Sequence, residues 1–206
     1  VGVIGSGTSN DFAAHLNTDI FNSVAENITR PVDLGLVNGA EYFINVASAG
    51  VFTSIAHEVN SRLKNFLGKS AYYLRGLGEI KNFKTVPLNI VADGKNFSVD
   101  AFLFLVLNSP SVAGFKKISD SAQIDDGKLD LLALKKCSAS ALINLAKKIL
   151  AGESIQADEN IFHVQAKTFE INSAEKLISD LDGEAGDFLP IKIQTLHHAI
   201  NFFGTP

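Results

Sequence analysis

A glycine-containing turn near the start of the chain has the residue types of a phosphate-binding loop. The apolar run Val1-Gly2-Val3-Ile4 leads into Gly5-Ser6-Gly7-Thr8-Ser9-Asn10-Asp11-Phe12. A strand that enters a glycine turn and then a helix directs backbone N–H groups at a phosphate. The chain has no methionine, and this turn falls within its first dozen residues. We therefore expect the chain to be part of a longer polypeptide and to begin inside a nucleotide site.

Two further acidic segments could supply a metal ligand and a base. Asp33 lies in Val32-Asp33-Leu34-Gly35, and Asp182-Gly183-Glu184 follows the apolar end of an expected strand. In an extended chain, residues two apart point to the same face, so Asp182 and Glu184 could serve one site. One carboxylate would then help to hold Mg²⁺ while the other accepts a proton.

Each of these acidic residues also has a structural explanation that the sequence leaves open. Asp-Gly is a common turn dipeptide, so Asp182 can equally belong to a tight turn. Asp11 can cap the helix that follows it. Asp33 on its own indicates no particular chemistry.

Another acidic turn precedes an expected strand, in Ile124-Asp125-Asp126-Gly127-Lys128-Leu129-Asp130. It lacks the alternating acids and the terminal glutamate of a helix–loop–helix calcium site, so a polar turn is the preferred local interpretation. Such a loop could still hold a hard cation through one carboxylate and two backbone carbonyls.

The remaining motifs are weaker. Gly68-Lys69-Ser70 is similar to the end of a phosphate loop, but Leu63 stands where the first glycine belongs. Cys137 has no evident base near it and is expected to be a small buried residue. Residues 62–69 mix basic and apolar side chains, which favours a solvated helix face over contact with anionic lipid. The histidines have no metal-ligand spacing; they are His15, His57, His163, His197 and His198.

Composition limits the class of protein. With 206 residues, of which 46% are hydrophobic and 19% charged, the chain can fold around one substantial core. A net charge of −4 without a basic stripe argues against nucleic-acid binding. A single cysteine fits a reducing compartment, and no apolar run approaches the roughly 20 residues that span a bilayer. We expect a soluble, cytoplasmic protein.

Alternating patterns and tight turns predict a mainly β protein. Hairpins are expected around Asn38-Gly39 and Asp93-Gly94. Residues 101–107 are apolar on both faces, as in a strand that is buried on both sides. Further strands are expected at 129–134, 161–171, 176–181 and 189–196, and helices at 19–28, 54–66, 70–83 and 138–150.

These elements favour a β-sandwich with inserted helices over a doubly wound sheet. The opening strand–turn–helix belongs to a different pattern and is expected to be the remnant of an α/β nucleotide-binding domain, at residues 1–29. The β-sandwich domain would occupy residues 30–206, and its last residues are candidates for a return to the missing domain.

Taken together, the motifs resemble the bacterial diacylglycerol kinase family, soluble lipid kinases related to sphingosine kinases and, more distantly, to NAD kinases. The resemblance covers essentially the whole chain. It rests on the order and spacing of many short segments rather than on any one of them. The matching segments are residues 7–12, 32–35, 43–50, 71–73 with Gly76, 113–115, 124–130 and 182–184.

The resemblance implies a kinase that transfers phosphate from ATP to a lipid alcohol, with diacylglycerol as the leading substrate and phosphatidic acid as the product. Its active site would lie between an α/β domain and a β-sandwich. Glu184 matches the general base, and Asp182 would support it. Residues assigned to nucleotide binding and to the water-mediated network around the catalytic Mg²⁺ are Gly7, Thr8, Asn10, Asp11 and Asp33.

The resemblance also implies a structural Mg²⁺ site. Gln123, Asp126 and Lys128 match its ligands, and Gln123 and Lys128 would contribute backbone carbonyls. A lipid substrate implies transient contact of the protein with a membrane surface. A homodimer is left open, with the strand at residues 101–107 as a candidate contact.

Two departures from the family pattern matter. The Gly-Gly-Asp-Gly-Thr nucleotide motif belongs upstream of Val1, so the chain alone is expected to be inactive. Gly5-Ser6 also stand where the family usually has larger residues. Two alternatives remain: a non-catalytic lipid-binding or regulatory module, and a kinase of the same architecture that acts on another lipid alcohol.

Overall fold

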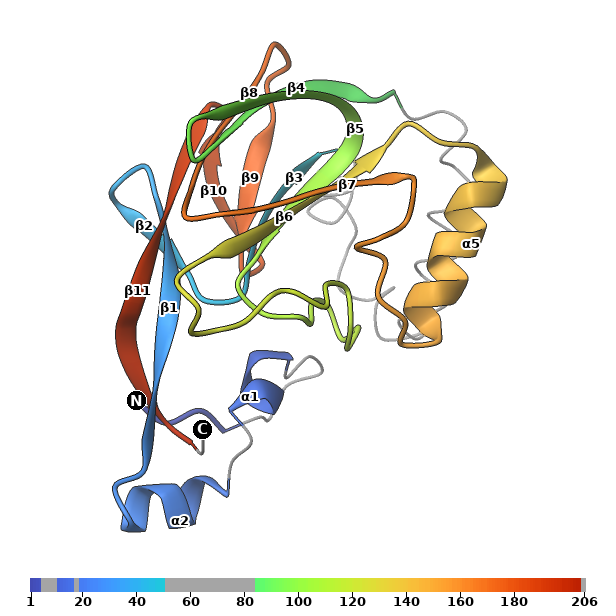
Figure 1. Cartoon of the computed structure of the whole chain (residues 1–206). Helices are drawn as coiled ribbons and strands as arrows, with labels where there is room; N and C mark the ends of the chain where they lie inside the picture. Colours follow the sequence, from blue (N-terminus) through green and yellow to red (C-terminus); the bar gives the residue numbers. More distant parts are fainter. Residues whose placement is uncertain (5–10, 17–18, 51–83, 205–206) are drawn as a thin grey trace.

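The computed structural model describes residues 1–4, 11–16, 19–50 and 84–204, and antiparallel strands dominate it (Figure 1). Its helices are α1 (Asp11–His15), α2 (Ile20–Ala25) and α5 (Ala139–Leu150). The strands are β1 (Thr29–Val37), β2 (Glu41–Phe43), β3 (Val46–Gly50), β4 (Val86–Ala92), β5 (Lys95–Leu107), β6 (Leu129–Lys135), β7 (Ile161–Ala166), β8 (Thr168–Ser173), β9 (Ile178–Leu181), β10 (Glu184–Phe188) and β11 (Ile191–Phe203).

The strands form one strongly curved antiparallel sheet in the order β10-β9-β3-β5-β4-β8-β11-β1-β2, and β6 and β7 continue from β5. Phe43, Phe104 and Phe169 are fully buried in its main core. The prediction of a mainly β fold with few helices is therefore confirmed. Residues 103–107 of β5 pair with both β3 and β6, so this stretch has no free edge for the dimer contact considered above.

Both predicted hairpins are confirmed, because each carries its turn residues at positive φ. Asp93 and Gly94 adopt φ of 45° and 79° between β4 and β5. Asn38 and Gly39 adopt φ of 50° and 72° between β1 and β2. Such backbone angles match the twist of a tight hairpin, and Asn, Asp and Gly tolerate them best.

The predicted single strand at residues 161–171 is wrong, since it consists of β7 and β8. The break falls at Lys167, whose N–H donates to the Asp93 carboxylate. The backbone carbonyl of Lys167 accepts from the N–H of Thr195, 2.9 Å away. These contacts end the β6–β7 pairing and start the pairing of β8 with β4 and β11.

The strands near the two ends of the chain also differ from those predicted. β10 was not predicted, because Glu-Ala-Gly-Asp-Phe lacks both alternation and strong β propensity. β11 is longer than expected and runs to Phe203. Residues 1–4 are not in a strand, although Val1 exchanges hydrogen bonds with the backbone of Asn201 and Phe203. The helices expected at 54–66 and 70–83 lie outside the described residues.

The predicted helix at residues 19–28 is shorter and less buried than its pattern indicates. α2 ends at Ala25, and Asp19 caps its start. Phe21 and Val24, expected on its apolar face, are 78% and 51% exposed. Within the described part of the chain, no helix combines the length and apolar character that a membrane crossing requires.

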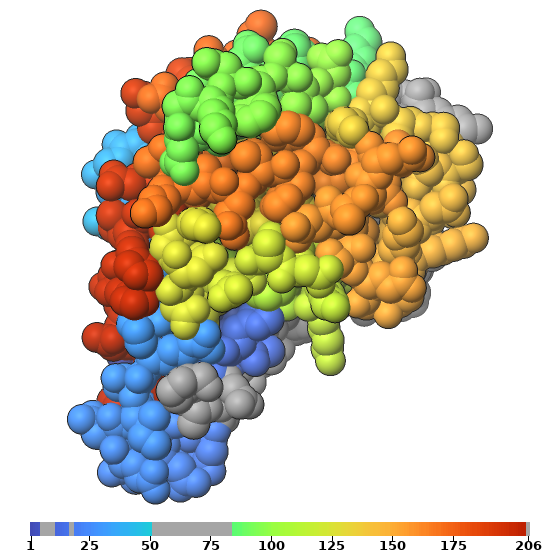
Figure 2. Space-filling view, in the orientation of Figure 1, coloured from blue at the N-terminus to red at the C-terminus, as the bar shows by residue number. Residues whose placement is uncertain are grey.

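The segment that contains α1 packs against the rest of the chain through a small core of its own. Leu16 is fully buried there with Val32, Ile124 and Phe202. The rings of Phe12 and Phe202 meet edge to face at 5.2 Å. Figure 2 shows blue atoms of the N-terminal part directly below the yellow-green atoms that precede β6. This core places α1 beside the acidic turn at residues 124–130.

Candidate functional site

Asp182 and Gly183 form a two-residue turn between β9 and β10. Both have positive φ, of 53° and 100°, and the flanking residues Leu181 and Glu184 are paired. Asp182 is therefore not part of an extended strand, so the condition under which it would share a strand face with Glu184 is not met. The turn alternative holds instead. Glu184 is exposed and is the first residue of β10.

The Asp182 carboxylate accepts hydrogen bonds from three consecutive backbone N–H groups. One oxygen accepts from Ile44 at 2.6 Å, and the other accepts from Asn45 at 3.0 Å and Val46 at 2.8 Å. The N–H of Asp182 also donates to the carbonyl of Val46. These contacts explain why the extended strand is interrupted between β2 and β3. Asp182 thus positions the hairpin that carries Glu184.

Asn45 extends this contact toward the loop after β5. Its side-chain amide donates to the backbone carbonyl of Ser111 at 3.1 Å, and its carbonyl accepts from the hydroxyl of Ser109. Asn108 is fully buried and donates to the carbonyls of Asp33 and Ile44. Its own side-chain oxygen has no hydrogen-bond partner among the described residues. Residues 108–111 of the loop after β5 are therefore held by hydrogen bonds to Asn45, Asp33 and Ile44.

The same loop holds the segment that contains α1. The ring of His15 is hydrogen-bonded to the hydroxyl of Ser111 at 2.7 Å. The N–H of Gly114 donates to both oxygens of Asp11, at 3.0 and 2.9 Å. Hydrogen bonds, together with the backbone of residues 111–114, therefore form a polar path between the Asp182 turn and Asp11. Of the other predicted nucleotide-site residues, Gly7, Thr8 and Asn10 lie outside the described residues.

His15 should make stability depend on pH near neutrality. Burial lowers the pKa of His15 below its ordinary value of 6.5; the Asp11 charge opposes this effect and the Arg30 charge adds to it. A histidine with a lowered folded-state pKa gives full stability above pH 6.5 and loses it as the pH falls toward the folded-state pKa. We expect His15→Gln to unfold with a shallower pH dependence than the wild type in this window. Urea unfolding at several pH values measures the difference, and identical slopes would contradict the expectation.

Asp33 is fully buried between β11 and the acidic turn. Its carboxylate accepts from the N–H of Gly127 at 2.6 Å, from the N–H of His198 at 2.7 Å and from the ring of His197 at 2.9 Å. The N–H of Asp33 donates to the carbonyl of Ile124. The structure therefore brings Asp33 together with the predicted metal loop at Gln123–Lys128.

Asp126 lies in this loop with features that suit a bound cation. Its carboxylate accepts from the N–H of Lys128 at 3.0 Å. Burial raises the pKa of Asp126, and the Asp130 and Asp33 carboxylates add to the rise while the Lys128 hydrogen bond opposes it. The protein thus leaves negative charge here incompletely compensated. One carboxylate with the carbonyls of Gln123 and Lys128 is a donor set that fits Mg²⁺.

A polar cluster around the buried Asp130 lies behind the loop. Asp130 accepts from the ring of His163 at 2.7 Å, from the side chain of Gln165 at 3.1 Å and from the hydroxyl of Ser121. Burial alone would raise the pKa of Asp130, but these hydrogen bonds together lower it. Gln165 also approaches Asp126 at 3.4 Å. Gln165 therefore links the cluster to the loop.

Several of these residues were missed in the sequence. His163, Gln165, Asn45 and Asn108 carry no local motif for the roles they have here. Arg30 was missed as well, although it forms an ion pair with Asp125 at 2.8 Å and also donates to the carbonyl of His15. All of these contacts join residues that are distant in sequence, so no local signal was available.

Comparison with known proteins identifies the family to which the chain belongs. A family model described as the YegS C-terminal NAD kinase beta sandwich-like domain matches residues 45–204. A diacylglycerol kinase of Bacillus subtilis (strain 168) is 39% identical over 207 residues, covering 98% of this chain and 68% of the relative. The chain belongs to the bacterial diacylglycerol kinase family. The resemblance predicted from its motifs is confirmed.

Two further proteins named as diacylglycerol kinases are also similar to this chain. A diacylglycerol kinase of Staphylococcus carnosus (strain TM300) is 36% identical over 208 residues, covering 98% of this chain and 67% of the relative. The crystal structure of a candidate diacylglycerol kinase from Bacillus anthracis str. Sterne superposes with a TM-score of 0.82 at 29% identity. That comparison covers 100% of this chain and 68% of the solved one. The chain thus spans about two-thirds of the length of these relatives.

Proposed function

We propose that the polypeptide carrying this chain phosphorylates the hydroxyl group of diacylglycerol, using ATP and Mg²⁺, to give phosphatidic acid. The family is one of lipid kinases, and kinases of this family use ATP. The observation that carries the proposal is the polar path from the Asp182 turn to Asp11. It ties the hairpin of the predicted base to the segment that follows the predicted phosphate turn.

In this mechanism the residues of the chain mainly position groups. Phosphoryl transfer depends largely on alignment and on neutralisation of charge, which Mg²⁺ supplies when it is bound to the phosphates. Glu184 is exposed at the start of β10, where a substrate hydroxyl can reach it. A lipid alcohol has a high pKa, so Glu184 first orients the hydroxyl and takes its proton late in the reaction.

Asp182 and Asp33 then have supporting roles in the proposed kinase. Asp182 holds the Glu184 hairpin through three backbone N–H groups. Asp33 is buried and fixes the metal loop through Gly127, so we assign it to positioning that loop. Asp11 keeps the role implied by the family, in the water-mediated network around the catalytic Mg²⁺.

Magnesium binding to the loop can be tested without any measurement of activity. Mg²⁺ at about 100 times its Kd should stabilise the wild type by about 2.7 kcal/mol. Asp126→Asn should lose most of this gain, because it removes the carboxylate ligand. Without Mg²⁺ the variant should be at least as stable as the wild type, since burial and nearby carboxylates disfavour the charge of Asp126. Thermal unfolding with and without Mg²⁺ measures both effects.

Asp120→Asn is the matched control, because Asp120 is an exposed carboxylate that precedes the same loop and pairs only with Lys117 at 3.2 Å in the described structure. It should keep the full response to Mg²⁺. An equal response in Asp126→Asn would remove Asp126 from the proposed ligand set.

The substrate is tested with a panel of lipids. The polypeptide as encoded, including any sequence before Val1, is assayed with ATP and Mg²⁺ on vesicles containing diacylglycerol, a sphingoid base or phosphatidylglycerol. The proposal predicts fastest phosphorylation of diacylglycerol. A clear preference for another lipid would support a kinase of the same architecture with a different acceptor. Binding to vesicles without phosphorylation would support the non-catalytic module.

A further inference from the structure

β11 carries a bulge opposite Asp33 that turns two consecutive histidines to the same side. The β1–β11 register shifts between Val32 and Leu34, and His198 adopts a positive φ of 52°. In a regular strand, neighbouring side chains point to opposite faces. Here the rings of His197 and His198 stack instead, with their centroids 3.6 Å apart and 29° between their planes. The bulge therefore presents two imidazoles together.

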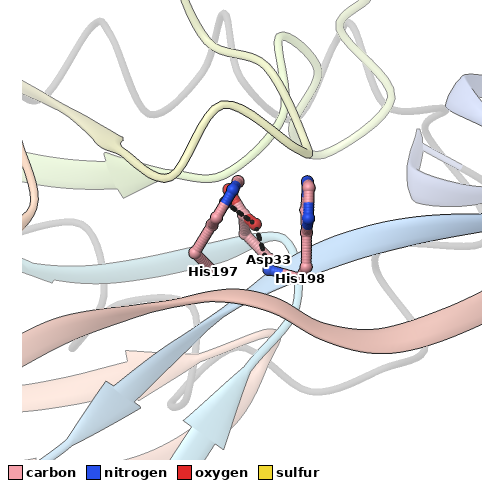
Figure 3. Close-up of side chains that lie close together, drawn as sticks. All are labelled: Asp33, His197 and His198. Carbon is pink, nitrogen blue, oxygen red and sulfur yellow. Dashed lines mark hydrogen bonds and ion pairs between the residues drawn. The ribbon is translucent and has the colours of Figure 1, made fainter.

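Asp33 lies directly beside both rings (Figure 3). One potential ligand atom from each of the three residues lies within 4.8 Å of the others. The Asp33 carboxylate is fully buried, whereas the His197 side chain is 51% exposed and His198 is exposed. The carboxylate of the cluster thus lies inside the protein, and the histidines lie on the solvent side, from which an ion can enter.

We propose that Asp33, His197 and His198 bind a divalent transition-metal ion of the Zn²⁺ type. Two imidazoles and one carboxylate are typical donors for Zn²⁺, whereas Mg²⁺ prefers oxygen ligands. A fully buried carboxylate also gains from a positive partner. The proposal does not depend on the kinase assignment, since it rests on these three side chains alone.

The distance between one pair of potential ligand atoms in the cluster is close to that in a metal site. Two tetrahedral ligands at about 2.0–2.1 Å from Zn²⁺ lie about 3.3 Å apart. His197 Nδ1 and Asp33 Oδ1 are 2.9 Å apart, so a shift of a few tenths of an ångström suffices. In the metal-bound form, the ion takes the place of the proton that these two atoms share.

His198 has the outer contact that commonly orients a metal-bound histidine. Its Nε2 lies 3.2 Å from the backbone carbonyl of Asp125. When Nε2 donates to this carbonyl, Nδ1 keeps the lone pair that can bind a metal. The backbone N–H of His198 also donates to Asp33 Oδ1, which fixes the histidine relative to the carboxylate.

The test is metal binding by untagged protein that has been freed of metal with a chelator. Calorimetry should show one Zn²⁺ bound per chain, and Co²⁺ should give visible absorption bands that Zn²⁺ removes. Excess Mg²⁺ should not displace either ion. His197→Ala and His198→Ala should each weaken Zn²⁺ binding by more than about tenfold, because loss of even an outer contact commonly has this effect. Both side chains are exposed, so circular dichroism should show an unchanged fold.

Two matched controls separate this site from other possible ligands. His15→Gln removes an imidazole from another site, and Cys137→Ser removes the only thiol; both should bind Zn²⁺ like the wild type. The proposal is overturned if the wild type takes up no Zn²⁺ at micromolar concentrations. It is also overturned if both histidine variants bind as tightly as the wild type, or if binding disappears in Cys137→Ser.

Discussion

Replacing Glu184 with glutamine is expected to lower the turnover of diacylglycerol about 10²- to 10⁴-fold, the usual contribution of a positioned acid or base. The amide is close to the carboxylate in size but cannot accept the proton of the lipid hydroxyl. ATP affinity should remain nearly unchanged, because the role of Glu184 concerns the lipid hydroxyl. Initial rates at saturating ATP, together with nucleotide binding to the same protein, measure the two quantities separately.

Glu170→Gln provides the matched control. Glu170 is an exposed glutamate on β8, and its carboxylate pairs with Lys192 at the surface. Its replacement should leave turnover close to that of the wild type. If Glu184→Gln also retains near-normal turnover, the base lies elsewhere and the proposed mechanism is wrong.

Replacing Asp182 with alanine is expected to destabilise the protein by about 2–4 kcal/mol, among the larger effects of a single substitution. The change removes the acceptor for the N–H groups of Ile44, Asn45 and Val46. It also places alanine at a φ of 53°, which asparagine and aspartate tolerate better. Water can reach part of the segment, which keeps the loss below the full cost of three buried donors. Urea unfolding at neutral pH measures it.

Two variants of the same hairpin make this prediction specific. Asp182→Asn keeps one carboxamide oxygen and tolerates positive φ, so it should lose less stability than Asp182→Ala. Asp187→Ala removes a carboxylate of β10 that accepts from the side chain of Asn38 at 2.8 Å, and it should cost less than about 1 kcal/mol. Equal losses in Asp182→Ala and Asp187→Ala would show that Asp182 does not hold the hairpin.

Local sequence signals predicted the hairpins well but not where strands end. Asn38-Gly39 and Asp93-Gly94 specify tight turns by their backbone preferences alone. The breaks at Lys167 and between β2 and β3 depend on the carboxylates of Asp93 and Asp182, which are 74 and 137 residues away from the N–H groups of Lys167 and Asn45. No local pattern contains that information.

The candidate site could be predicted only in part, again because contacts between residues that are distant in sequence leave no local pattern. Asp33 and Asp126 were selected because the segments that contain them resemble those of the family, and the structure brings Asp33 to the Asp126 loop. The partnership of Asp33 with His197 and His198 was missed, because the histidines have no metal-ligand spacing along the chain. It arises from a bulge in β11 that only the register with β1 defines.

The proposed kinase activity is tested by following transfer of the γ-phosphate of ATP to diacylglycerol. The polypeptide as encoded is incubated with ATP, Mg²⁺ and vesicles that contain diacylglycerol, and the lipid products are identified by mass spectrometry. We expect phosphatidic acid in the wild-type reaction, and almost none with Glu184→Gln or when Mg²⁺ is removed. Binding of ATP by the wild type without phosphorylation of diacylglycerol would contradict it.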